Sequence, residues 1–122
     1  WPPWTASGRL LLGHLSDDEI RALIPPEDYR LPDGRVISEE AFLAEIVAAR
    51  RDHVSETSGL ADRFTWCMAA PINDSHGIAT RTLCLVLPID TPEQRRNELL
   101  AMLRERARSV SLSGTRSARS PV

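Results

Sequence analysis

The sequence has little of several residue types, and each shortage excludes a class of protein. It contains no lysine, since all 15 basic residues are arginine, and its net charge of −2 leaves no basic patch typical of direct nucleic-acid binding. Two cysteines are too few for a disulfide framework and are typical of an intracellular protein with reduced thiols. No apolar run approaches the roughly 20 residues that a membrane helix needs, and no signal peptide begins the chain. We therefore expect a cytoplasmic protein that has no membrane partner.

What is present suffices for one folded domain, because the 122 residues are 42% hydrophobic. Three segments have the signals of helices: residues 16–24, 38–52 and 91–110. Each begins with a hydroxyl-bearing residue that can accept a hydrogen bond from the first helical turn. The first and third continue with Glu or Gln three positions later, which is the pattern of a capping box. The expected N-caps are Ser16, Ser38 and Thr91.

Two further segments, residues 63–72 and 78–88, have the character of strands joined by the turn "NDSHG". A turn centred near Ser75 places Cys67 opposite Leu83 or Cys84. In the second of these registers both cysteines lie on one face of the hairpin. Residues 27–37 and 52–62 are rich in polar and turn residues and are expected to be loops. The resulting order is an α+β pattern with only two strands, so either strands are missing or a partner supplies an edge.

No motif in the sequence favours catalysis. The histidines and cysteines lack the spacing of a metal site, and no P-loop, nucleophile elbow or dinucleotide fingerprint is present. A cysteine–histidine nucleophilic pair is possible in principle, but no local signature supports it. The simplest interpretation of Cys67 and Cys84 is that they are buried and act as small apolar residues. We therefore expect no metal, no cofactor and no enzymatic activity.

Four blocks, in order, resemble the effector-binding domain of the IclR family of bacterial transcription regulators. They are "TASGRLLLGHLSDDEIRALI", "ISEEAFLAEIVAARRDHV", "WCMAAPINDSHGIATRTLCLVLP" and the closing helix, over about residues 5–112. The pattern A-A-P-I-x-D-x-x-G is the most specific part. Members of the family join an N-terminal winged helix-turn-helix to a GAF-like α+β domain with a curved antiparallel sheet flanked by helices, and they are usually dimers or tetramers.

The resemblance implies a ligand-sensing domain that is incomplete. Residues 1–112 would form a partial GAF-like domain without its first strands, and the Ser/Arg-rich residues 113–122 would be a disordered tail. A small effector, often a carboxylic or aromatic acid, would bind on the sheet and change the state of a homo-oligomer. DNA would be contacted only through an N-terminal domain that is absent here.

The resemblance also indicates which residues would contact the effector. Two lie near a helix start, where backbone N–H groups of the family hold a carboxylate. Others line the sheet, and one of two neighbouring residues, Glu56 or Thr57, falls where the family often has an acid. The expected site residues are Ala6, Ser7, Glu56, Thr57, Thr65, Cys67, Cys84 and Val86.

Two of these residues depart from the family pattern. Cys84 and Val86 stand where the family has serines, so a weak donor and an apolar group replace two hydroxyls. Either the effector is more apolar, or the pocket has lost its ligand. The alternatives to a sensor are therefore a structural oligomerisation module and, with less support, a small enzyme on a GAF-like fold.

Overall fold

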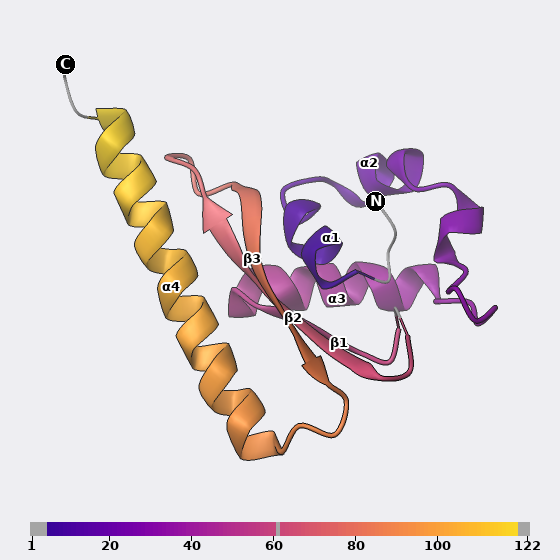
Figure 1. Ribbon diagram of the computed structural model, residues 1–122. Helices are drawn as coiled ribbons and strands as arrows, with labels where there is room; N and C mark the ends of the chain where they lie inside the picture. Colours follow the sequence, from indigo (N-terminus) through magenta and orange to yellow (C-terminus); the bar gives the residue numbers. More distant parts are fainter. Residues whose placement is uncertain (1–4, 61, 120–122) are drawn as a thin grey trace.

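The computed structural model describes the backbone of residues 5–60 and 62–119 and the side chains of those residues as far as Leu112 (Figure 1). It has the expected α+β architecture, with α4 on one face of an antiparallel sheet and α1 and α3 on the other (Figure 1). None of the helices described is both long and apolar enough to cross a membrane. In chain order the elements are α1 (Ala6–Leu11), α2 (Asp17–Leu23), the 3-10 helix η1 (Pro26–Tyr29), α3 (Glu39–Asp52), β1 (Ser55–Ser58), β2 (Thr65–Asn73), β3 (Ala79–Pro88) and α4 (Glu93–Arg119).

The first two predicted caps are present. The hydroxyl of Ser16 accepts from the backbone N–H of Glu19 at 3.2 Å, and the Glu19 carboxylate accepts from the N–H of Ser16 at 3.1 Å. The hydroxyl of Ser38 begins α3 by accepting from Ala41. The capping box predicted at Thr91 is not formed, because the Thr91 hydroxyl donates to the carbonyl of Pro88 at 2.7 Å. At its other end, α4 continues past residue 112 to Arg119, and residues 120–122 of the expected tail lie outside the described chain.

The hairpin forms in a different register from either predicted one. Cys67 is paired with Val86, and Cys84 is paired with Ala69. The turn runs from Asp74 to Ile78, and a bulge follows Ile72, so the strands meet further along β3 than a turn centred on Ser75 would allow. The observed pairing differs from the second predicted register by two residues, so both cysteines lie on one face, as that register predicted.

A third strand lies where we expected a loop. β1 pairs antiparallel with β2, and Ser55 lies opposite Ala69 while Thr57 lies opposite Cys67. Its four residues, "SETS", contain no apolar side chain, so the alternation that marks a strand is absent from the sequence. The other expected loop, 27–37, contains η1 and an isolated bridge between Arg30 and Val36.

Three apolar clusters hold these elements together. One joins α2, η1 and α3 around Phe42 and Ile20. A second lies between the sheet and α4, where Met68 meets Leu103. A small third cluster of Ala6, Leu10, Ala49 and Ala69 connects α1, α3 and the sheet. Because three of its four members are alanines, α1 approaches the sheet closely and its first turn reaches β3.

Candidate functional site

Side chains from all three strands form one face of the sheet, on the side of α1. The cross-strand pairs put Thr57 beside Cys67 and Cys67 beside Val86, and residues two apart along a strand point the same way. We define the open face as the outer part of this surface, formed by Thr57, Thr65, Cys67, Cys84 and Val86. α1 covers the neighbouring part around Ala69, whereas Cys84 is exposed and the side chain of Val86 is 64% exposed. The open face is therefore a shallow surface and not a closed cavity.

A cluster of hydroxyl and thiol groups joins the first turn of α1 to β3 at the margin of the open face. The hydroxyl of Ser7 lies 2.7 Å from the sulfur of Cys84. The hydroxyl of Thr82 donates to the Ser7 hydroxyl at 3.0 Å and lies 3.4 Å from the same sulfur. Thr82 was not among the expected site residues, although strand alternation places it on the same face as Cys84.

The two residues expected near a helix start lie in the first turn of α1. Ala6 is buried against Leu10 and the sheet, so it contributes packing at this point. Ser7 is only half-buried, and its side chain faces β3. Thr5 precedes them as the N-cap and accepts from the backbone N–H of Gly8 at 3.2 Å.

β1 distinguishes the two candidates for the acidic position. Thr57 is buried and lies opposite Cys67, on the same side as the open face. Glu56 lies opposite Met68 and faces the α4 side, away from the other expected site residues. Its carboxylate accepts from the indole N–H of Trp66 at 3.1 Å, and the guanidinium carbon of Arg96 lies 3.9 Å from the centre of the Trp66 ring. Glu56 thus belongs to a contact between the sheet and α4.

The open face offers uncharged hydrogen-bond donors next to apolar surface. Without Glu56, the predicted site has hydroxyls, two thiols, a methyl group and an isopropyl group, and none of these is charged. Hydroxyl groups can donate to an anionic or neutral oxygen, and the valine offers surface for an apolar ligand. Among the described residues, no group of three His, Cys, Asp or Glu side chains is arranged to hold a metal ion.

Comparisons with known proteins agree with this architecture. The family described as bacterial transcriptional regulator IclR, C-terminal, matches residues 4–112. The transcriptional regulator KdgR of Escherichia coli is 29% identical over 109 residues, which cover 88% of this chain and 41% of KdgR. The crystal structure of the KdgR C-terminal domain superposes with a TM-score of 0.79 at 28% identity, over 92% of this chain and 70% of that one.

Two further structures show the same fold with a small molecule present. One is a double mutant of the PobR inducer-binding domain from Acinetobacter in complex with 3-hydroxybenzoic acid, with a TM-score of 0.74, 20% identity and coverage of 90% of this chain and 65% of that one. The other is an IclR homologue from Microbacterium hydrocarbonoxydans in complex with 4-hydroxybenzoate. It superposes with a TM-score of 0.73 at 23% identity, over 93% of this chain and 46% of that one.

Proposed function

Because this chain belongs to the IclR family of bacterial transcriptional regulators, through their C-terminal domain, we propose that it senses a small carboxylic acid at the open face. The observation that carries the proposal is the cluster of Ser7, Thr82 and Cys84 at the margin of the exposed surface of Val86. A polar end and an apolar body of one ligand would find matching surfaces there. The two relatives with bound hydroxybenzoates support an aromatic acid as the chemical class.

The binding mode follows from the donors available. The hydroxyls of Ser7 and Thr82 bond to each other in the unliganded chain, and both can turn to donate to a carboxylate. The ring of the acid would lie over Val86 and Cys67, where burial of apolar area contributes about 25 cal/mol per Å². Because none of the five open-face residues carries a positive charge, the apolar contact would supply most of the affinity. The site therefore favours an effector with a substantial apolar part.

Regulation would follow from a difference in affinity between two states. We expect the complete regulator to be a dimer or tetramer that acts in the cytoplasm and contacts DNA through a winged helix-turn-helix domain. The effector shifts the arrangement of the DNA-binding domains only if it binds one arrangement more tightly than the other. No catalytic step is part of this function, because the open face has no titratable pair suited to acid–base chemistry.

The test is a thermal-shift titration with 3-hydroxybenzoate and 4-hydroxybenzoate. A ligand at one hundred times its Kd adds about 2.7 kcal/mol to the free energy of unfolding. Val86→Trp should abolish this stabilisation because the indole covers the open face. Val47→Trp is the matched control, since Val47 on α3 is also 64% exposed and lies outside the site. Stabilisation that is equal in both variants, or absent from a cooperatively folded wild-type chain, would overturn the proposal and favour a structural oligomerisation module.

A further inference from the structure

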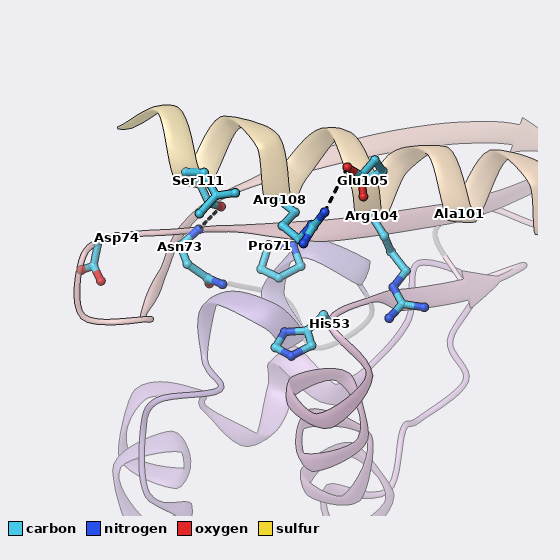
Figure 2. Close-up of a pocket in the computed structure, with 10 residues that line it drawn as sticks. His53, Pro71, Asn73, Asp74, Ala101, Arg104, Glu105, Arg108 and Ser111 are labelled. Atoms are coloured by element: carbon cyan, nitrogen blue, oxygen red, sulfur yellow. Dashed lines mark hydrogen bonds and ion pairs between the residues drawn. The ribbon is translucent and has the colours of Figure 1, made fainter. Parts of the chain in front are cut away.

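A groove that shares no residue with the open face lies at the other end of β2. β1 begins opposite Ala69, so Pro71 and Asn73 extend beyond it at this edge of the sheet. α3 ends at the same place and α4 passes above it, which leaves a hollow of about 530 Å³ (Figure 2). This volume is within the range of small-molecule sites, which is roughly 300–1,000 Å³. We call it the edge groove; it is lined by His53, Pro71, Asn73, Asp74, Ala101, Arg104, Glu105, Arg108, Ser111 and Leu112.

Several polar side chains of the edge groove already have partners. Arg108 donates to Glu105 at 3.3 Å. The carboxylate of Asp74 accepts from the backbone N–H groups of His76 and Ile78, at 2.8 and 3.0 Å. The hydroxyl of Ser111 donates to a carbonyl of its own helix and accepts from the backbone N–H of Asn73 at 2.8 Å. These groups shape the groove and have little capacity left for a ligand.

Three polar side chains remain available. Within the described part of the chain, the guanidinium of Arg104, the imidazole of His53 and the carboxamide of Asn73 make no hydrogen bond or ion pair. Figure 2 shows His53 below Pro71, with Arg104 reaching down from α4 beside it. Each can donate, and an arginine guanidinium can hold a carboxylate through two parallel hydrogen bonds. The remaining capacity of the groove is therefore for an acceptor with negative charge.

The backbone of His53 supports a role for its side chain. His53 is the C-cap of α3 and has φ of 56° and ψ of 36°, and it is the only non-glycine with positive φ in the described chain. Glycine or asparagine is usual at such a position because a larger side chain adds steric cost. Unusual backbone conformations of this kind concentrate at functional sites. The histidine at this position places an imidazole in the groove, which a glycine would not provide.

The electrostatics at this end of α3 agree with an anionic ligand. The pKa of Asp52 is lowered, first by its hydrogen bonds from Arg51 and further by the positive charges of Arg51, Arg104 and His53. Two hydrogen bonds at 2.9 and 3.2 Å occupy both oxygens of Asp52 with Arg51. Arg104 thus contributes positive potential near a carboxylate that is paired with another residue.

We propose that the edge groove is a second ligand site, which binds a planar aromatic carboxylate through Arg104 and His53. The ring would lie against the apolar surfaces of Pro71 and Ala101, and the carboxylate would accept from the guanidinium and from the imidazole N–H. Asn73 would complete the set of donors at the opposite side. The edge groove shares no residue with the open face, so a ligand can bind at one of them without binding at the other.

The experiment is an NMR titration of the whole chain with sodium benzoate, observed at the imidazole carbon–proton signals. The expected result is a saturable shift of the His53 signals. His53→Asn assigns the signals, since asparagine also accepts the left-handed conformation. Arg104→Gln should weaken benzoate binding at least tenfold. Arg106→Gln, an exposed arginine of α4 that does not line the groove, should leave it unchanged.

A His53 signal that does not respond to benzoate would overturn the inference. An equal affinity in Arg104→Gln and Arg106→Gln would also overturn it. Val86→Trp separates this proposal from the proposed function, because it blocks the open face and should leave the response of His53 intact. A His53 response lost in Val86→Trp and kept in Arg104→Gln would assign the binding to the open face alone.

Discussion

Arg9 fixes α1 against α3 through a charge that has almost no access to water. Its side chain is 4% exposed, and its guanidinium lies 2.5 Å from the carboxylate of Glu45. Burial lowers the pKa of Arg9, and the charge and hydrogen bond of Glu45 act in the opposite direction. The Nε–H of Arg9 has no partner among the described residues, so Glu45 is the principal compensation for the buried charge.

Glu45→Gln should therefore destabilise the fold, because it leaves a buried charge without its counter-ion. Breaking a fully buried pair costs about 3–5 kcal/mol. Glu45 is 53% exposed, so water screens part of the interaction and the expected loss is about 1–3 kcal/mol. The measurement is urea unfolding of the variant and of the wild-type chain. Glu98→Gln is the control, because its pair with Arg95 is exposed at both ends and should contribute under about 1 kcal/mol. Equal losses in the two variants would contradict a special role for the buried pair.

At the scale of elements, Asp74 organises the turn between β2 and β3. Its pKa is lowered, chiefly by the backbone N–H of Ile78 and then by that of His76. A carboxylate whose pKa is lowered in the folded state stabilises the fold at pH values above its unfolded pKa, which is near 3.8. That contribution is lost as the pH falls through the pKa of the folded state. The hairpin thus contains an acid-sensitive contact that is intact at neutral pH.

Asp74→Asn should lower stability at pH 7 and have a smaller effect at pH 3, since pH 3 lies below the unfolded pKa and part of the carboxylate's contribution to stability is lost there. The measurement is the urea midpoint of each protein at the two pH values. Asp90→Asn is the control, because Asp90 makes no hydrogen bond among the described residues and its effect should not follow this pattern. A loss for Asp74→Asn that is as large at pH 3 as at pH 7 would show that the charge is irrelevant.

The elements that could be predicted are those whose signals are local. The capping box of α2 lies within four residues, so Ser16 and Glu19 suffice to locate it. The shared face of Cys67 and Cys84 was predicted by one of the two registers considered, and it survives because the observed register differs from that one by an even number of residues. The register itself depends on Asp74 and its hydrogen bonds across the turn, which composition alone does not determine.

The elements that could not be predicted depend on distant partners. β1 has no apolar residue, and its strand conformation follows from pairing with β2. That pairing also separates Thr57 from Glu56, a choice that the resemblance left open. The contact of Thr82 with Ser7 joins residues 75 positions apart. The edge groove likewise combines the ends of α3 and β2 with α4, so no single segment of sequence contains its signal.

At the scale of the whole molecule, α1 is the connection between two larger bodies. The helical cluster around Phe42 and the cluster between the sheet and α4 have no residue in common. Leu10 belongs to the small third cluster that joins α1 to Ala49 of α3 and Ala69 of β2. The same helix carries Ser7 to the open face. Its position should therefore determine both the cooperativity of folding and the affinity for an effector.

Leu10→Ala should cost about 2–5 kcal/mol, since Leu10 is buried and its truncation leaves a cavity. Because the lost contacts join the two bodies, we expect unfolding in two steps and a weaker effector affinity through displacement of Ser7. Leu103→Ala is the matched control: it removes the same atoms from a leucine of equal burial in the cluster between the sheet and α4. It should cost a similar amount and leave the effector affinity nearly unchanged.

The measurements are urea unfolding observed by tryptophan fluorescence and by circular dichroism, and effector titration under native conditions. Coincident transitions and equal affinities in both variants would mean that the sheet alone positions Ser7, and that α1 does not couple the two bodies.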